Sequence, residues 1–291
     1  MVNVEVAVPC KNMLGEGPVW DVQEQMIYWV DGKSSEIWRH NPATGETRTW
    51  NTPEDPGSFA LRENGKGLVV AMWNGFRFFD LETGETTVIE DMEQDLPNSR
   101  FNDGRCDRQG RFWVGSMDDK HTDPIGSLYR LDADLGHEVQ ERGVICSNST
   151  CFSPDGETMY YADTYINTIW AYDLDTASGQ LSNRRVFADT TDMKGVPDGS
   201  IVDAEGYLWN AMWDGWSVIR FAPDGSVNRI IEVPVQRPTC PMFGGKNLDR
   251  LYVTSARIGL EPDDLVTQPD AGALLALDPG VKGVPETRFA G

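Results

Sequence analysis

Histidine is scarce in this chain, which has only His40, His121 and His137 in 291 residues. A Ser-His-Asp or Cys-His triad needs a well-placed imidazole, and the sequence has no G-x-S-x-G elbow to present a serine nucleophile. The H-E-x-x-H motif is also missing, so a histidine-rich zinc site has no support. These absences leave the oxygen atoms of carboxylates and amides as the expected basis of any activity.

Cysteines and long apolar runs are also few. The five cysteines form an odd number without a C-x-x-C pair, and they are Cys10, Cys106, Cys146, Cys151 and Cys240. Free, buried thiols in a reducing compartment fit this pattern better than a disulfide framework. No stretch reaches the roughly 18 apolar residues of a membrane helix, and the N-terminus lacks a basic segment followed by a long apolar run. We therefore expect a soluble, cytoplasmic protein with no membrane partner.

Basic residues are in the minority, with 25 Lys and Arg against 46 Asp and Glu, a formal net charge of −21. A surface of this charge repels phosphate backbones and anionic lipids, which argues against nucleic acid as a partner. The same charge raises the local concentration of metal cations.

The clearest pattern in the sequence is a strand-like segment that occurs six times. The copies are MIYWVD at 26–31, LVVAMW at 68–73, FWVGSM at 112–117, MYYADT at 159–164, LWNAMW at 208–213 and LYVTSA at 251–256. Successive copies lie 41 to 48 residues apart. A period near 45 residues, filled with strands, is typical of a β-propeller.

Each copy carries the other parts of a propeller blade. Four copies follow a tight turn, at Asn64-Gly65, Gln109-Gly110, Asp155-Gly156 and Glu205-Gly206, as the second strand of a hairpin does. A third strand follows, and outer segments such as TRTWN and RVFAD alternate polar and apolar residues like a half-exposed edge. We therefore predict an all-β fold, a six-bladed β-propeller of four-stranded blades, as a single domain over residues 1–291.

The N-terminal segment VNVEVAV has no hairpin partner of its own. We expect it to pair with the last blade near Thr287, Arg288 and Phe289, so that the N- and C-terminal strands close the ring. Closure of this kind removes the open sheet edge, and a closed ring does not need a partner chain. A monomer is the expectation.

Polar residues in the first strands of the blades predict a site in the central channel. These strands line the channel of a propeller, so Glu16, Asn148 and Asp198 are expected to converge although they lie far apart in the sequence. Two carboxylates and an amide form a hard-oxygen site for a divalent cation such as Ca²⁺, Mg²⁺ or Mn²⁺. Arg100 and Asn102, in the segment SRFNDGRCD with Asp103, add a fixed positive charge and an amide that can donate and accept.

Each of the three predicted ligands also has an ordinary explanation. Glu16 lies between glycines and Asp198 precedes Gly199, as turn residues do, and Asn148 suits a turn or a cap. What favours a site is their shared position, just ahead of the hairpin of a blade.

At this point several long segments show a family resemblance. They are LGEGPVW, RFNDGRCD, the GSM of 115–117, the SNRRVF of 182–187, VPDGSIVDAEGYLW, FGGKNLDRLYVTSAR and the ending GALLALDPGVKGVPETRFAG. They closely resemble the senescence-marker-protein/gluconolactonase family, which includes regucalcin and bacterial sugar lactonases. The resemblance covers nearly the whole chain in the right order, and it also implies a six-bladed propeller.

The resemblance implies roles for particular residues. The family's metal-binding Glu, Asn and Asp correspond to Glu16, Asn148 and Asp198, and its substrate-contacting Arg and Asn to Arg100 and Asn102. One position departs from the pattern, because Lys120 stands where regucalcin-like members have a substrate-contacting Glu. Lys120 is therefore a candidate substrate contact, with Asp118 or Asp119 as substitutes if the loop shifts.

The function implied is metal-dependent hydrolysis of a sugar lactone to its aldonic acid. The substrate is an aldono-1,4- or 1,5-lactone, such as a glucono-, galactono-, arabinono- or xylonolactone, and the cation is Ca²⁺, Mg²⁺, Mn²⁺, Zn²⁺ or Fe²⁺. Water attacks a carbonyl that the cation polarises, and Asp198 orients or deprotonates that water. A competing version makes Asp198 a ligand only.

Two further classes stay open at the level of the sequence. One is a phosphotriesterase-like or other lactone hydrolase with the same exposed cation. The other is a non-catalytic calcium-binding propeller, since a fold alone does not define a function.

Overall fold

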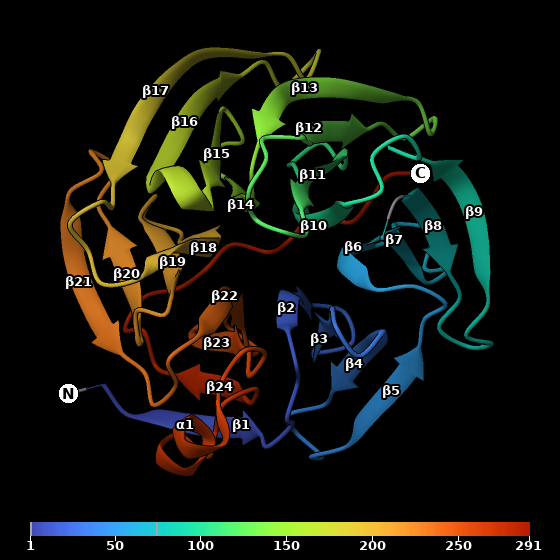
Figure 1. Cartoon of the computed structure of the whole chain (residues 1–291). Coiled ribbons are helices and arrows are strands. Elements are labelled where there is room, and N and C mark those ends of the chain that lie inside the picture. Colours follow the sequence, from blue (N-terminus) through green and yellow to red (C-terminus); the bar gives the residue numbers. More distant parts are fainter. Residues whose placement is uncertain (1, 74) are drawn as a thin grey trace.

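The computed structural model describes residues 2–73 and 75–291. In this part of the chain, 24 strands form six four-stranded antiparallel sheets, which stand around a central axis as the blades of a propeller (Figure 1). The predicted six-bladed fold is therefore confirmed. Among the described residues, no helix has the length and apolar character to cross a bilayer.

The blades share one strand order from the axis outward. The innermost strands are β2 (Gly15–Asp21), β6 (Pro56–Leu61), β10 (Ser99–Cys106), β14 (Ser147–Phe152), β18 (Val196–Val202) and β22 (Pro238–Gly244). The second strands are β3 (Met26–Asp31), β7 (Leu68–Met72), β11 (Phe112–Asp118), β15 (Thr158–Asp163), β19 (Leu208–Trp213) and β23 (Arg250–Ser255). These second strands are the six repeated segments of the sequence.

The outer half of each blade is made of a third and a fourth strand. The third strands are β4 (Glu36–His40), β8 (Gly75–Phe79), β12 (Gly126–Leu131), β16 (Thr168–Leu174), β20 (Ser217–Phe221) and β24 (Leu274–Leu277). The outermost are β5 (Thr47–Asn51), β9 (Thr86–Asp91), β13 (His137–Val144), β17 (Leu181–Asp189), β21 (Val227–Glu232) and, in the last blade, β1 (Val4–Val8). A short helix, α1 (Pro262–Thr267), lies between β23 and β24.

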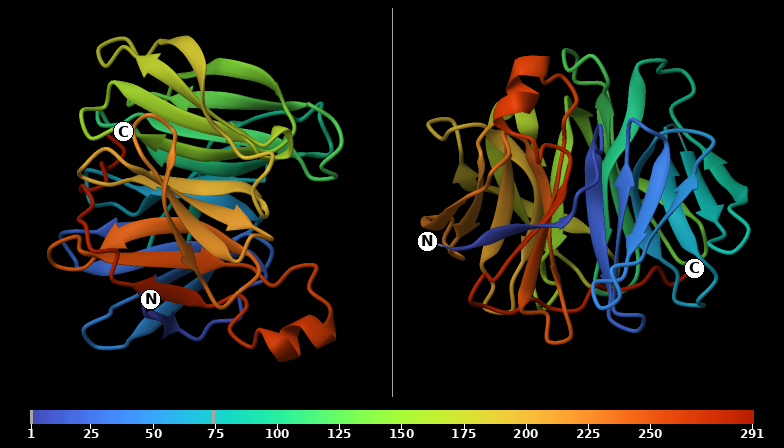
Figure 2. Two further views of the ribbon diagram at one scale, coloured as in Figure 1. Left: turned by 90° about the vertical axis from the view of Figure 1, so that its left-hand side faces the viewer. Right: turned by 90° about the horizontal axis from the view of Figure 1, so that it is seen from below.

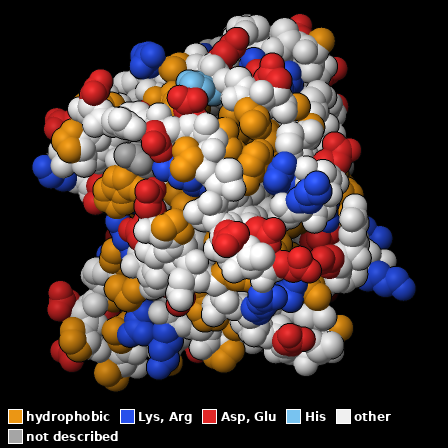
Figure 3. All heavy atoms as spheres, turned by 90° about the vertical axis from the view of Figure 1, so that its right-hand side faces the viewer, with side chains coloured by type: hydrophobic (Ala, Val, Ile, Leu, Met, Phe, Trp, Pro, Cys, Tyr) orange, Lys and Arg blue, Asp and Glu red, His pale blue; other side chains and the backbone are white. Residues whose placement is uncertain are grey.

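Burial follows this order because each blade packs its faces against its neighbours. The second strands are almost fully buried, and they carry the largest core side chains, among them Trp29, Trp113 and Trp209. The residues of the outermost strands are mostly exposed or half-buried, as expected for blade edges, although they do not alternate strictly. On the side shown in Figure 3, acidic and basic side chains are interspersed among apolar ones, so the negative charge does not form one continuous patch there.

The ring is closed by β1, which pairs with β24 in the register Val4 to Leu277. The prediction was right about the blade and wrong about the partner near Thr287–Phe289. Those residues lie beyond β24, where the backbone of Phe289 bonds to Leu61 and Glu63 of the second blade. Phe289 is fully buried there, and this apolar contact draws the segment away from the blade edge.

Residues 282–291 form a segment that we call the C-terminal strap. It runs from the last blade across the end of the ring opposite the N-terminal ends of the innermost strands (Figures 1 and 2). Its backbone bonds to Ala204, Leu248 and Gly110, and Arg288 pairs with Asp21 at 2.7 Å. The strap thus ties several blades together beneath the channel.

Candidate active site at the channel mouth

The predicted ligands occupy equivalent places in three innermost strands. Glu16, Asn148 and Asp198 lie near the N-terminal ends of β2, β14 and β18, and therefore at one end of the ring. The register of each strand with its neighbour shifts at this point, between Glu16 and Val19 in β2 and at the matching positions of β14 and β18. A bulge bends the strand and redirects a side chain. The repeated bulges explain why polar residues far apart in the sequence face one channel.

Two glycines allow these bends. Gly17 follows Glu16 with a φ of 52°, in the left-handed region that a residue with a Cβ atom rarely adopts. Gly199 follows Asp198, where an added Cβ atom would lie 2.5 Å from the side chain of Cys240 on β22. Any larger residue at Gly199 would push two innermost strands apart. The turn-like dipeptides of the sequence are therefore part of the channel wall.

A line of hydrogen bonds connects the site from blade to blade. Arg100 Nη1 donates to Asn102 Oδ1 at 2.9 Å, and Asn102 Nδ2 donates to Asn148 Oδ1 at 3.2 Å. Asn148 Nδ2 donates to Thr164 Oγ1 at 2.8 Å, and Thr164 Oγ1 donates to the carbonyl oxygen of Pro197 at 2.9 Å. The structure therefore brings together Arg100, Asn102, Asn148 and the residue before Asp198. It also fixes which atom of each amide faces its neighbour.

The carboxylates of the site are buried close to one another. Glu16 is 7% exposed and Asp198 is 4% exposed. Burial, followed by the negative charge of Asp103, raises the pKa of Glu16 to about 8. Burial and then the charge of Glu16 raise the pKa of Asp198 well above its ordinary value, and burial raises the pKa of Asp103. The positive charges of Arg100, near Glu16 and Asp198, and of Arg105, near Asp103, lower these pKa values by less than burial raises them.

The donor set fits a divalent cation. Within residues 2–73 and 75–291, neither Glu16 nor Asp198 takes part in a salt bridge, and the one hydrogen bond to the Glu16 carboxylate comes from the amide of Gly17. Asp103 Oδ1 is buried without a hydrogen-bond partner in the same range, although Oδ2 accepts from the amide of Thr150 at 2.7 Å. Buried carboxylates are normally paired or bound to metal.

The site differs from metal sites built on acids, histidines and cysteines alone. In the part of the chain that the structure describes, no group of three or more His, Cys, Asp or Glu residues is arranged to hold a metal ion. A cation here would be held by Glu16 and Asp198 with the neutral Oδ1 atom of Asn148. That set is still composed of oxygen donors, which suits a hard cation.

Asp119, rather than Lys120, contacts the candidate substrate arginine. Asp119 Oδ1 accepts from Arg100 Nε at 2.7 Å and from Lys33 Nζ at 3.0 Å. Lys120 is exposed, and its backbone amide bonds to Asp118 Oδ1 at 3.3 Å. Asp118 is turned into its own loop, where it also accepts from the amides of Thr122 and Asp123. The role of Lys120 as a substrate contact stays a prediction.

Thr164 was missed by the sequence analysis. It follows β15 and lies next to Asn148 only because the blade folds back on itself, and no motif marks this pairing. Its signal in the sequence is one Thr at the end of the repeated segment MYYADT. A second role of Asn102 was also missed. Its Nδ2 atom donates hydrogen bonds to Asn148 Oδ1 and to the carbonyl oxygen of Ser147, so it is a support for Asn148.

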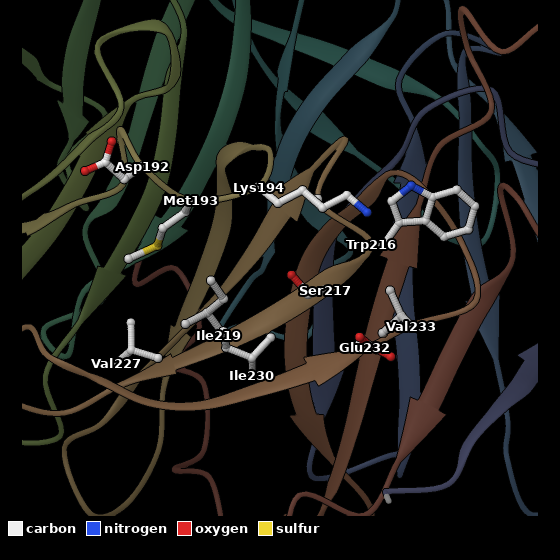
Figure 4. A pocket seen from close by; sticks show the side chains of 11 residues that line it. Asp192, Met193, Lys194, Trp216, Ser217, Ile219, Val227, Ile230, Glu232 and Val233 are labelled. Atoms are coloured by element: carbon white, nitrogen blue, oxygen red, sulfur yellow. The ribbon is translucent and has the colours of Figure 1, made fainter.

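A separate hollow of about 580 Å³ lies at the fifth blade and contains none of the predicted site residues. It is lined by Met193 and Lys194 and by side chains of β20 and β21, including Ile219 and Ile230 (Figure 4). The predicted chemistry and this hollow are therefore distinct.

The fold and site together define a class. The chain is a six-bladed β-propeller with a buried set of carboxylate and amide oxygens at the mouth of its channel. It belongs to the SMP-30/gluconolactonase/LRE-like family, whose model matches residues 14–257. The predicted family is thus confirmed.

Similar proteins cover almost the whole chain. It is 40% identical over 284 residues to the L-arabinolactonase of Azospirillum brasilense, with 97% of this chain and 93% of that protein covered. It is 37% identical over 281 residues to the 6-deoxy-6-sulfogluconolactonase of Pseudomonas putida, with 96% of each covered. Regucalcin from Agrobacterium tumefaciens, described as a calcium-binding protein, superposes with a TM-score of 0.94 at 33% identity, covering 99% of this chain and 97% of that one. The prediction of a lactone hydrolase agrees with the names of the first two relatives.

Proposed function

We propose that the protein is a metal-dependent lactonase that hydrolyses an aldono-1,4- or 1,5-lactone to the aldonic acid. The observation that carries the proposal is the buried pair Glu16 and Asp198, which has no salt-bridge partner among the described residues and lies at the same end of the ring as Asn148. The similarity to two proteins named sugar lactonases supports the choice of substrate class. The residues that would hold the cation are Glu16, Asn148 and Asp198.

When bound, the divalent cation supplies positive charge that polarises the lactone carbonyl and stabilises the negative oxygen formed as water attacks. Asp198 accepts the proton of the attacking water, because burial raises the pKa of its carboxyl group and makes the carboxylate a stronger base. The water oxygen bonds to the carbonyl carbon, and the ring carbon–oxygen bond breaks. The proton then passes to the ring oxygen, which leaves as a hydroxyl group.

The substrate is oriented by Arg100. Its Nε atom donates to Asp119, and its Nη1 atom donates to the carbonyl oxygen of Phe101 and to Asn102 Oδ1. Within the described residues, Nη2 has no hydrogen-bond partner. We assign that atom to a ring hydroxyl. Asn102 contributes by holding Asn148 as well as by any contact with substrate, since its Nδ2 atom faces Asn148.

A second candidate function is cation binding without catalysis. It draws on the description of the similar regucalcin structure as a calcium-binding protein. The hydrogen-bonded link from Arg100 to Asn148 favours catalysis, because a cation store does not need a guanidinium beside its ligands. The phosphotriesterase-like alternative has no comparable support from the relatives named above.

The deciding experiment is acid release from pentono- and hexonolactones, followed with a pH indicator. Metal-stripped protein is assayed alone and with Ca²⁺, Mg²⁺, Mn²⁺, Zn²⁺ or Fe²⁺, against the spontaneous rate under the same conditions. Cation-dependent acceleration supports the lactonase. Tight cation binding with no acceleration on any lactone, and none on an aryl phosphotriester, selects the binding protein instead.

The proposal includes a cytoplasmic, single-domain monomer. All five cysteines are buried and free, which suits a reducing compartment. Light scattering coupled to size-exclusion chromatography tests the oligomeric state.

A further inference from the structure

Arg105 is a buried guanidinium just below the candidate site. It lies on β10, two residues after Asp103, and is 4% exposed. Buried arginines require partners for nearly all their donors, so the contacts of Arg105 define its surroundings. None of the steps proposed above uses this residue.

The contacts of Arg105 cross the channel. Nε donates to the carbonyl oxygen of Thr150 on β14 at 3.2 Å, and Nη2 donates to that of Ser200 on β18 at 3.3 Å. Nη2 also lies 3.7 Å from Cys240 Sγ on β22, which belongs to the opposite side of the ring. One side chain from the third blade therefore bonds to the innermost strands of the fourth and fifth blades and touches that of the sixth.

Two of these contacts have the same relation to the predicted ligands. Thr150 lies two residues after Asn148, and Ser200 lies two residues after Asp198. Both stretches include the bulge that directs the ligand into the channel. A group that joins their carbonyl oxygens therefore controls the distance between the strands that carry an amide ligand and a carboxylate ligand.

Arg105 is itself fixed by the C-terminal strap. Nη1 bonds to Glu286 Oε2 at 2.8 Å, and both side chains are almost fully buried. Arg108 bonds to the same strap at the carbonyl oxygen of Pro285, at 3.2 Å, and pairs with Glu286 Oε1 at 3.8 Å. Its other bonds reach Ser153 and Phe152 at the far end of β14. The strap thus supports two arginines, and Arg105 is the one that bonds to both β14 and β18.

We propose that Arg105, held by Glu286, is a positioning residue that sets the spacing of Asn148 and Asp198 and thereby the size of cation that the site selects. The inference rests on the proposed function in that it takes these residues as ligands. Mg²⁺ requires near-ideal geometry at 2.0–2.1 Å, whereas Ca²⁺ accepts varied geometry at 2.3–2.6 Å. A site whose strands are no longer clamped should lose affinity for the smaller cations first.

The test is the dissociation constant of Ca²⁺, Mg²⁺ and Mn²⁺, measured by titration calorimetry on metal-stripped protein without substrate. The variants are Arg105→Lys, Glu286→Gln and, as matched control, Arg108→Lys. We expect Arg105→Lys and Glu286→Gln to weaken Mg²⁺ and Mn²⁺ binding at least tenfold. The factor by which they weaken Ca²⁺ binding should be at least threefold smaller. Arg108→Lys should leave all three constants within twofold of the unaltered protein, while losing a similar amount of thermal stability.

A purely electrostatic role is separated by a double variant, Arg105→Met with Glu286→Gln, which removes both charges together. Equal weakening of all cations in Glu286→Gln, with unchanged constants in Arg105→Lys, which keeps the charge, and recovery in the double variant, overturns the positioning role. Unchanged constants in folded Glu286→Gln and Arg105→Lys proteins overturn it as well. If the unaltered protein binds none of the cations, Asn148 and Asp198 are not metal ligands and the inference is wrong. The lactone assay on that protein then shows separately whether it hydrolyses lactones.

Discussion

The amide of Asn102 donates a hydrogen bond of 3.2 Å to Oδ1 of Asn148, on the next blade of the ring. The opposite end of the Asn148 side chain is held by Thr164 at 2.8 Å. An amide held on both sides presents its oxygen in one orientation, which is what a ligand to a cation requires. Asn102 therefore supports the candidate metal site from outside it.

The first prediction concerns this support. Asn102→Leu should weaken Ca²⁺ or Mn²⁺ binding about tenfold, because outer partners of metal ligands typically contribute 10- to 100-fold in affinity. The measurement is calorimetric titration of the metal-stripped variant. Asn247→Leu, an exposed position, is the matched control and should bind as the unaltered protein does. Equal affinities in both variants would contradict the role.

Asp198→Asn tests the proposed base and ligand. The change preserves size and removes the charge and the proton acceptor, so kcat/KM on the preferred lactone should fall by about 10³-fold. Stopped-time acid release under saturating cation measures it. Asp189→Asn, on an exposed outer strand, is expected to have normal kinetics. Near-normal turnover of the Asp198 variant would remove this residue from the mechanism.

Asp119 and Lys120 are neighbours on one loop, and substituting each in turn distinguishes two predictions about substrate binding. Asp119→Ala frees Arg100 from its 2.7 Å partner, and we expect KM to rise about tenfold with a smaller change in kcat. Lys120→Ala should change neither by more than about twofold if Asp119 holds the substrate arginine, since the Lys120 side chain is exposed. A larger effect of Lys120→Ala would instead favour the substrate contact implied by the family pattern.

The stability of the metal-free protein should depend on pH through Glu16. Its pKa is raised to about 8 in the folded protein, mainly by burial, so the folded state retains a proton that the unfolded state releases above about 4.5. Stability is therefore greatest below the unfolded pKa, falls as pH rises between these two values, and levels off above about 8. We expect the melting temperature of metal-stripped protein to fall between pH 5.5 and 8, and saturating cation to offset most of this loss.

The control for this pH dependence is Glu16→Gln. A neutral side chain of the same size does not titrate, so the metal-free variant should show a shallower slope over the same range. Cation affinity in the unaltered protein should rise with pH, since protons compete for Glu16. A slope unchanged by the substitution would assign the effect to other groups.

For the C-terminal strap, we predict an effect on the stability of the fold. Phe289 is fully buried against a core cluster that includes Phe101 and Phe112. Phe289→Ala should reduce the free energy of unfolding by about 3–5 kcal/mol. Urea denaturation measures it, with Val266→Ala, 79% exposed on α1, as the control that should cost little.

The fold was predictable because every blade repeats the same periods and turns. The ligands were predictable for a related reason, since the same point of the repeat carries a bulge in β2, β14 and β18. A residue that breaks an apolar strand pattern at a repeated position therefore faces the channel.

The contacts between repeats were not predictable. Thr164 meets Asn148, and Glu286 meets Arg105, through packing that leaves no local pattern in the sequence. The partner of β1 was misassigned for the same reason, because both β24 and the segment near Phe289 have suitable strand patterns. Which of the two segments pairs with β1 depends on which apolar side chains become buried in the folded ring.

The pairing of Val4 with Leu277 places the earliest and one of the latest segments of the chain in a single sheet. During synthesis, β1 emerges from the ribosome long before β24, its neighbour in the sheet. Closing a loop of this length carries a large entropic cost, and the preceding blades must already hold their positions for the two strands to meet. The last blade is therefore expected to be the slow step of folding, and its unfinished edge to be where chaperones and other unfolded chains find the nascent protein.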